Sequence, residues 1–196
     1  HGIGIGDLLD KVISSLPEKE IPDYGGAITF SLIGRPNVGK SSLANRLLGE
    51  ERTIVSDVAG TTRDSVDTPF TKDGSNYVVI DTAGLVKRGM IYEAVDKYAA
   101  LRALSAMERS DVCVLLIDGS TGILEQDKHV VGYAMDEKKA IVLLVNKWDL
   151  GKEKKFDKNR FIEDIHNQFK FLDYATILFI SAATGEGVDK VLPAIK

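Results

Sequence analysis

The sequence has one cysteine in 196 residues, no long apolar run and no excess of basic charge. The lone Cys113 excludes an internal disulfide. The absence of both an apolar run of about 18 residues and a charged stretch leading into an apolar signal predicts no membrane association and a cytoplasmic location. Lys and Arg number 25 against 29 Asp and Glu, for a formal net charge of -4, so no overall basic field attracts nucleic acid.

The order of apolar segments predicts an α/β fold. With 44% hydrophobic and 28% charged residues, the chain can bury one sizeable core. Apolar runs typical of buried strands alternate with segments whose apolar residues recur at helical spacing, which favours a mostly parallel sheet covered on both faces. Alternation at 66–70, the turn Asp73-Gly74 and the run 77–80 predict a hairpin that adds one antiparallel edge strand. The other predicted strands are 27–33, 112–118, 141–145 and 177–180, and the predicted helices are 41–48, 94–107, 126–135, 159–169 and 188–195.

A phosphate-binding loop is indicated at 34–41, between the first predicted strand and helix. The segment reads GRPNVGKS and matches G-x-x-x-x-G-K-[ST] in the context that this pattern requires. Its glycines let backbone N–H groups turn toward a phosphate, and the helix N-terminus adds a positive dipole end. We expect Lys40 to reach the β- and γ-phosphates and the Ser41 hydroxyl to bind Mg²⁺. The nucleotide-binding residues predicted here are Gly34, Arg35, Pro36, Asn37, Val38, Gly39, Lys40, Ser41 and Ser42.

The base is indicated by the string NKWD at 146–149, which follows the apolar run 141–145 and matches the guanine motif N-K-x-D. The Asp149 carboxylate only accepts hydrogen bonds, so it can pair with guanine N1–H and the exocyclic amine, whereas adenine presents an acceptor at N1. We expect Lys147 to pack along the base, the asparagine to brace the loop, and a backbone N–H in 181–183 to read guanine O6. The nucleotide-binding residues predicted from these two loops are Asn146, Lys147, Trp148, Asp149, Ser181, Ala182 and Ala183.

Magnesium and the γ-phosphate are indicated by two further segments. Asp81 follows the second hairpin strand, where a carboxylate can hold Mg²⁺ through water, and the amide of Gly84 can meet the γ-phosphate. Thr61 and Thr62 both lie in the polar stretch before the hairpin, and we assign the Mg²⁺-binding hydroxyl to Thr62. The predicted Mg²⁺ ligands are thus Ser41, Thr62 and Asp81, the predicted catalytic residues Lys40, Thr62 and Gly84, and the further nucleotide contacts Asp81, Thr82, Ala83, Gly84 and Leu85.

With these motifs in order, the chain resembles the second GTP-binding domain of the bacterial Der (EngA) GTPases. The resemblance implies a three-layer P-loop fold of the Ras-like G-domain kind, GTP hydrolysis and work in assembly of the large (50S) ribosomal subunit and its rRNA. It also implies a first G domain and a KH-like domain that this sequence does not include. The strings that carry it are GRPNVGKSSL, VAGTTRD, DTAGL, ERSDVCVLLIDG, GILEQDK, NKWD and FLDYA.

Two departures from the best-known GTPase pattern bear on mechanism. Leu85 stands where many GTPases have a glutamine that orients water, so intrinsic hydrolysis is expected to be slow. Asn37 occupies a position that resembles potassium-dependent GTPases, where its side-chain oxygen, with carbonyls at 56–58, would bind K⁺; a simple turn role for Asn37 is the alternative. Arg88 can reach toward phosphate, although a solvated or RNA-facing role is favoured.

Residues 1–16 repeat the glycine pair and the apolar spacing of 184–196. We therefore expect 1–16 to be the C-terminal helix tail of a preceding G domain, 17–26 a linker and 27–196 the G domain; a chance glycine pair is the alternative. Among functions, the main alternative is a slow nucleotide-gated RNA- or ribosome-binding module whose hydrolysis only resets it. GTPases of tRNA modification or iron transport, and ATPases or nucleotide kinases, are less consistent with the motifs.

Overall fold

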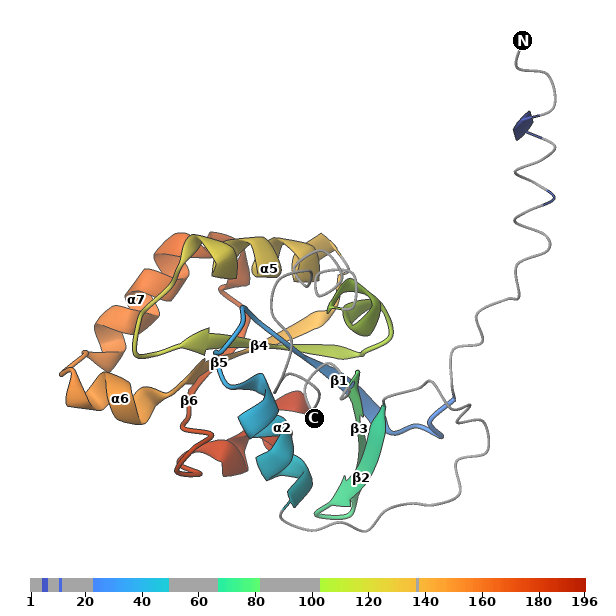
Figure 1. Ribbon diagram of the computed structural model, residues 1–196, viewed down its shortest axis with the longest axis horizontal. Helices are drawn as coiled ribbons and strands as arrows, with labels where there is room; N and C mark the ends of the chain where they lie inside the picture. Colours follow the sequence, from blue (N-terminus) through green and yellow to red (C-terminus); the bar gives the residue numbers. More distant parts are fainter. Residues whose placement is uncertain (1–4, 7–10, 12–22, 50–66, 82–102, 137) are drawn as a thin grey trace.

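The computed structural model describes residues 5–6, 11, 23–49, 67–81, 103–136 and 138–196, which form one six-stranded sheet with helices on both sides (Figure 1). The strands are β1 (Ile28–Ile33), β2 (Thr68–Lys72), β3 (Ser75–Ile80), β4 (Val112–Asp118), β5 (Ala140–Asn146) and β6 (Thr176–Phe179). Their order in space is β2-β3-β1-β4-β5-β6, and every neighbouring pair is parallel except β2 and β3. The predicted fold class, a mostly parallel sheet with one antiparallel edge strand, is confirmed.

The edge hairpin closes through Asp73 and Gly74, whose φ angles are 51° and 71°. Two consecutive residues with positive φ match the twist of the flanking strands, and an Asp-Gly pair adopts them at little cost. The pairing of Lys72 with Ser75 on either side fixes the register.

Helices cover the two faces of the sheet. The helices are α2 (Lys40–Gly49), α5 (Glu125–Asp136), α6 (Trp148–Glu153), α7 (Lys158–Gln168) and α8 (Val191–Ile195), with 3-10 turns η1 (Lys170–Leu172) and η2 (Val188–Lys190). Residues 103–108 are also helical. In Figure 1, α2 lies on the opposite side of the sheet from α5 and α7.

The alternation of side chains along the buried strands creates two cores. On β5, Val142 and Leu144 pack with α2 and α8, whereas Leu143 and Val145 pack with α5 and α7. Successive residues of a strand point to opposite faces, so a strand covered on both faces must be apolar throughout. This explains why the strand runs could be recognised from sequence without polar alternation.

One observed helix was not predicted, and one predicted helix is divided into two shorter segments. Helix α6 was not predicted, because WDLGKE has no amphipathic pattern and contains Gly151. That glycine is required by packing, since a Cβ there would lie 2.9 Å from the Gly119 carbonyl oxygen. The last predicted helix, 188–195, is split into η2 and α8.

Several predictions fall outside the described residues. They include Val66, helix residues 94–102 and most of the segments 1–16 and 17–26, so the proposed domain boundaries remain predictions. Within the described ranges, every helix is too short or too polar to cross a bilayer.

We predict that Leu144→Ala destabilises the protein strongly. Leu144 is fully buried in the core beneath α2 and α8, and deleting its branched side chain leaves a cavity between sheet and helices. The free energy of unfolding should fall by about 2–5 kcal/mol, measured by urea denaturation. Leu124→Ala, at a leucine that is 41% exposed, is the control and should cost about 1 kcal/mol or less. Equal losses in the two variants would contradict the two-core description.

Candidate nucleotide-binding site

The loops that carry the predicted motifs leave one edge of the sheet. Strands β1, β3, β4, β5 and β6 all run in the same direction, so their carboxyl ends meet there. In open α/β sheets this edge is where ligands bind. The residues that follow the five strands begin with Gly34, Asp81, Gly119, Lys147 and Ile180.

The loop between β1 and α2 depends on two glycines. Gly34 has φ 144°, and a Cβ on it would lie 2.6 Å from the Leu116 carbonyl oxygen. Gly39 has φ 101°, and its Cβ would lie 2.2 Å from Asn146 Nδ2. A side chain at either position would push the loop away from the neighbouring strand, which is why this motif requires glycine here.

Lys40 opens α2 and folds back along this loop. Its Nζ donates hydrogen bonds to the carbonyl oxygens of Gly34 at 2.6 Å and Arg35 at 2.7 Å. The ammonium group is thereby held beside the backbone N–H groups of the helix N-terminus, which together favour an anion. Asn37, at the tip of the loop, is exposed and has φ 63°, a conformation that asparagine tolerates better than most residues.

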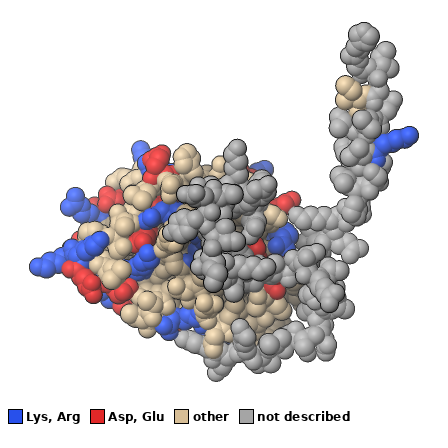
Figure 2. Space-filling model, viewed as in Figure 1, with Lys and Arg blue, Asp and Glu red and all other residues tan. Residues whose placement is uncertain are grey.

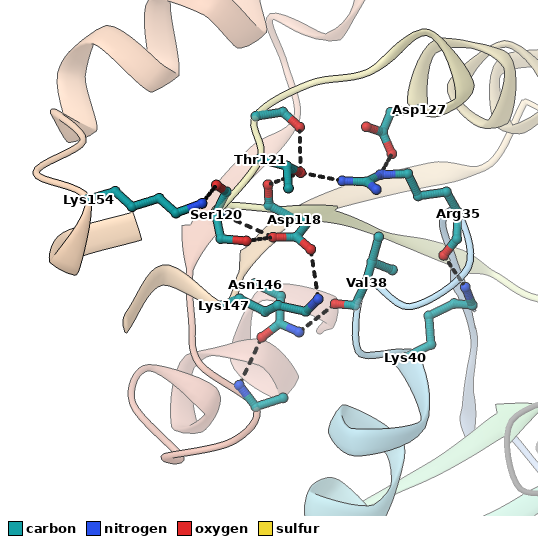
Figure 3. Close-up of polar contacts among 12 residues, drawn as sticks. Arg35, Val38, Lys40, Asp118, Ser120, Thr121, Asp127, Asn146, Lys147 and Lys154 are labelled. Carbon is teal, nitrogen blue, oxygen red and sulfur yellow. Dashed lines mark hydrogen bonds and ion pairs between the residues drawn. The ribbon is translucent and has the colours of Figure 1, made fainter. Parts of the chain in front are cut away.

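Arg35 anchors the same loop to α5 (Figure 3). Its Nη2 donates to Thr121 Oγ1 at 2.6 Å, and its Nε lies 3.3 Å from Asp127 Oδ1. Asp127 is completely buried; burial raises its pKa, against the lowering effect of the Leu124 N–H and Arg35. Arg35 was predicted to bind nucleotide, but in the structure its guanidinium is directed toward α5.

Asn146 joins the phosphate loop to the last loop of the site (Figure 3). Its Nδ2 donates to the Val38 carbonyl at 2.7 Å, and its Oδ1 accepts from the Ala182 N–H at 2.8 Å. The side chain is 1% exposed, so both bonds are shielded from water. The predicted bracing role of Asn146 thus has a definite geometry: one amide holds two loops that are far apart in sequence.

Lys147 is held by Asp118, the last residue of β4. Lys147 has φ 59°, and its Nζ donates to Asp118 Oδ2 at 2.7 Å. Ser120 donates to the other carboxylate oxygen from both its hydroxyl and its N–H. Burial raises the pKa of Asp118, but the hydrogen bonds from Lys147 and Ser120 outweigh it and leave the pKa below its usual value. The Lys147 side chain is therefore held in place by Asp118 at its charged end.

The next two residues, Trp148 and Asp149, have side chains in different environments. The Trp148 ring is 6% exposed and packs edge-on against Phe161 and Phe179, with centroids 5.7 and 4.5 Å away. Its side chain is therefore part of the core rather than a nucleotide contact. Asp149 has one buried carboxylate oxygen, Oδ1, that accepts no hydrogen bond from the residues described. Such an acceptor is costly unless a ligand donates to it.

The loop 181–183 follows β6 and is fixed from two sides. Asn146 takes the Ala182 N–H, and the Ser181 N–H donates to the Glu186 carbonyl at 2.9 Å. Arg46, in the last turn of α2, donates to the carbonyl oxygens of Ala182 and Ala183 at 2.8 and 2.7 Å. The N–H of Ala183 is the one that these described bonds do not use.

Two of the predicted Mg²⁺ ligands lie at the edge of the sheet where the parallel strands end. Ser41 is the second residue of α2, and Asp81 directly follows β3; both are partly exposed. A hydroxyl and a carboxylate supply the hard oxygen donors that Mg²⁺ prefers, and the ion usually keeps waters and phosphate oxygens as well. Two such donors leave room for phosphate oxygens and water around the ion, so they fit a Mg²⁺ ion shared with a nucleotide.

The remaining predicted site residues lie outside the described part of the chain. This applies to Thr61, the carbonyls at 56–58 and Arg88, and their roles remain predictions. The same applies to the predicted site residues Thr62, Thr82, Ala83, Gly84 and Leu85.

Sequence reasoning missed the residues that hold the motifs in place. Asp118, Arg46 and Asp127 contact motif residues but were not among the predicted site residues. A signal existed for Asp118, because it is an acidic residue that ends an apolar strand at the same level as Asn146, with which it pairs across the sheet. Arg46 and Asp127 gave no comparable signal, since each contacts a site residue that is remote in sequence.

The lysines after the NKWD string are largely engaged within the fold. Lys152 forms an ion pair with Glu186, Lys154 donates to the Ser120 carbonyl at 2.8 Å, and Lys158 lies over the Phe179 ring. Figure 2 shows Lys and Arg interspersed with Asp and Glu on the visible face, without an area of one sign. On this face the described residues therefore offer no broad basic patch for RNA.

Comparison with known proteins identifies relatives of this chain. Two relatives named GTPase Der, from Lactobacillus acidophilus and Bacillus cytotoxicus, are 54% and 56% identical over all 196 residues. The chain spans 45% of the length of each, so it matches one part of a longer protein. The resemblance inferred from the motifs is confirmed.

Solved structures share the fold. A crystal structure of Era in complex with MgGDPNP and a segment of 16S ribosomal RNA has a TM-score of 0.64 and 27% identity, covering 86% of this chain and 55% of that one. An Era variant from Aquifex aeolicus bound to GDP and AlF4⁻ has a TM-score of 0.63 at the same identity, covering 85% of this chain and 55% of that one. A family model described as 50S ribosome-binding GTPase matches residues 29–147. Because that match covers more than half of the chain and includes the phosphate loop, Asp81, Asp118 and Asn146, the chain belongs to the 50S ribosome-binding GTPase family.

Proposed function

We propose that residues 27–196 bind GTP together with Mg²⁺ and hydrolyse it to GDP and phosphate. The observation that carries the proposal is the Asn146 side chain, which joins the phosphate loop to the loop 181–183 beside the unpaired Asp149 oxygen. Phosphate recognition and base recognition are thus tied together in one rigid unit. The Era structure with MgGDPNP, at 27% identity, supports the same ligand chemistry.

Guanine recognition follows from Asp149 and its neighbours. The buried Oδ1 would accept from guanine N1–H or the exocyclic amine, which satisfies an oxygen that otherwise has no described donor. Adenine has an acceptor at N1 and would leave this oxygen unpaired, which such a site rejects strongly. Lys147, held by Asp118, would cover the base, and we assign the Ala183 N–H to guanine O6 because those of Ser181 and Ala182 are used within the fold.

Phosphate binding uses the loop 34–39, Lys40 and the start of α2. Lys40 would move from the carbonyls of Gly34 and Arg35 to the β- and γ-phosphates, exchanging neutral acceptors for charged ones. Ser41 would bind Mg²⁺ directly and Asp81 through water. An ion held by these two residues would neutralise negative charge that develops on the phosphates during transfer. Thr62 and Gly84 remain the proposed partners of Mg²⁺ and the γ-phosphate.

The rate is proposed to be slow and sensitive to K⁺. Leu85 offers no hydrogen bond to the attacking water, and no arginine is assigned as a finger. The exposed Asn37 at the loop tip could instead present its side-chain oxygen to K⁺, with carbonyls at 56–58.

Within a longer protein, this domain is proposed to act in assembly of the large ribosomal subunit, and the description of its family as 50S ribosome-binding GTPases supports an action on that subunit. Residues 1–16 would be the tail of a preceding G domain and 17–26 a linker. The alternative is a nucleotide-gated ribosome-binding module in which hydrolysis only resets the bound state. Steady-state hydrolysis with and without 50S subunits distinguishes the two. A GTPase that does not depend on its partner has the same turnover rate alone as with 50S subunits, whereas the turnover of a nucleotide-gated module depends on their presence.

The first prediction concerns the base. Asp149→Asn should weaken GDP binding by roughly 10²- to 10⁴-fold, because an amide cannot replace two charge-assisted hydrogen bonds, and should favour XDP, whose 2-carbonyl can accept from the amide. Competition of GDP and XDP against a fluorescent nucleotide measures the change. Asp157→Asn, at the exposed N-cap of α7, is the matched control and should keep GDP preference. If Asp149→Asn still preferred GDP, the assignment of Asp149 would be wrong.

The second prediction concerns the metal. Ser41→Ala should lower Mg²⁺-dependent hydrolysis roughly 10²-fold while the fold is retained, since it removes a ligand from a loop and not from the core. Asn45→Ala, at an exposed position on the same helix, serves as the control for helix stability. Turnover is measured at saturating GTP and varied Mg²⁺, with circular dichroism as the test of folding. Unchanged turnover in folded Ser41→Ala protein would exclude Ser41 as a ligand.

The third prediction concerns K⁺. At equal ionic strength, hydrolysis should be about ten-fold faster in KCl than in NaCl, because a cation beside the phosphates stabilises developing charge in a partly wet loop. Asn37→Gly should abolish the difference and leave GDP affinity nearly intact. Glycine is the right replacement because Asn37 has φ 63°, which alanine would adopt only with strain. Equal rates in the two salts would refute the K⁺ assignment for this chain.

A further inference from the structure

Asp67 lies at the centre of a buried hydrogen-bond cluster outside the predicted motifs. Its side chain is 2% exposed and directly precedes β2. Both oxygens are used by Arg109, whose Nη1 and Nη2 lie 2.5 and 3.1 Å away. Oδ2 also accepts from the Tyr24 hydroxyl at 2.5 Å, and Oδ1 accepts from the backbone N–H of Asp81 at 2.9 Å. The cluster Tyr24–Asp67–Arg109 thus ends on a residue of the proposed metal site.

The members of this cluster come from separate parts of the chain. Tyr24 lies in the turn before β1, and its ring packs against Val78, Ile80 and Ala106. Arg109 follows the helical residues 103–108. Burial and the hydrogen bond to Asp67 raise the pKa of the Tyr24 phenol well above its usual value, so the hydroxyl remains a donor. The turn before β1 is therefore connected to the carboxyl end of β3 through a single carboxylate.

The bond from Asp81 fixes the backbone at the point where β3 ends. Asp81 has φ 56°, a left-handed conformation that few residues other than glycine, asparagine and aspartate adopt. Asp67 accepts the N–H of that residue and so restricts the direction in which its carboxylate leaves the strand. The charge of Arg109 also acts on Asp81. Both effects bear on the oxygen assigned to Mg²⁺.

We propose that Tyr24 and Asp67 are positioning residues for Mg²⁺ binding: they hold Asp81 in place, and they couple the segment before β1 to the metal side of the nucleotide site. This rests on the proposed role of Asp81 as a Mg²⁺ ligand through water. Tyr24 touches neither nucleotide nor metal; it acts on Asp81 through Asp67.

The surroundings of Tyr24 make its hydroxyl important for this coupling. The turn lines a cavity of about 400 Å³ together with Ile28, Thr29, Arg109 and Asp111. Gly25 and Gly26, with φ of 61° and 79°, have nothing within 4 Å of an added Cβ. The ring contacts and the bond to Asp67 join this turn to the sheet, together with the packing of Ala27 on the same residues.

Tyr24→Phe tests the proposal, because it removes the hydroxyl and keeps the ring. In nucleotide-free protein, the exchange rate of the Asp81 amide hydrogen, measured by NMR, should rise about three- to ten-fold. The Mg²⁺ concentration for half-saturation of binding of a fluorescent non-hydrolysable GTP analogue should rise by a similar factor. The midpoint of thermal unfolding should change little. Tyr133→Phe, at an exposed tyrosine on α5, is the matched control and should change none of these quantities.

Asp67→Asn completes the test of whether Tyr24 acts through Asp67. The amide keeps the shape but weakens the Arg109 and Tyr24 contacts, so a larger effect is expected, and adding Tyr24→Phe to it should cause no further change. Unchanged Asp81 exchange and Mg²⁺ half-saturation in Tyr24→Phe, or a purely thermal effect, would overturn this inference and leave the proposed function standing. If the unsubstituted protein bound the GTP analogue without Mg²⁺ dependence, both proposals would fall.

Discussion

The nucleotide site depends most on one buried amide, that of Asn146. Its two hydrogen bonds connect the Val38 carbonyl of the phosphate loop to the Ala182 N–H of the loop after β6. With the side chain 1% exposed, neither backbone group has water as an alternative partner, so losing the amide would leave both unsatisfied. The close approach also explains Gly39, because a Cβ there would collide with the same amide. This one contact therefore explains why residue 146 is an asparagine and residue 39 is a glycine.

That contact is possible because the sheet is parallel. β1, β5 and β6 deliver their following loops to one edge, and Asn146, as the last residue of β5, lies between the other two loops. The sequence was sufficient to predict this arrangement, since the buried strands are continuous apolar runs and each motif begins where a run ends. A motif whose residues are adjacent in sequence specifies its own backbone conformation. The phosphate loop could therefore be predicted from residues 34–41, and the bracing role of Asn146 from residues 146–149.

The contacts that support the motifs could not be anticipated in the same way. Asp118 holds Lys147 from 29 residues away, and Arg46 holds Ala182 from 136. Such pairs depend on how strands and helices pack, which leaves no periodic trace in the sequence. Helix α6 could not be predicted for a related reason. Glycine disfavours a helix locally, but Gly151 lets this helix approach the Gly119 carbonyl closely. Trp148 shows that a motif position can serve the core, since its ring packs on Phe161 and Phe179.

The two sides of the site are held by different kinds of interaction. On the base side, the Asn146 bridge is neutral, and both of its partners belong to the nucleotide loops themselves. On the metal side, Asp81 is held by the charged pair of Asp67 and Arg109, which is also tied to Tyr24 in the turn before β1. The Asn146 bridge includes no residue outside the loops of the site. The charged cluster includes Tyr24, which lies outside those loops, so the coupling that we propose would act on Asp81 and not on the Asn146 bridge.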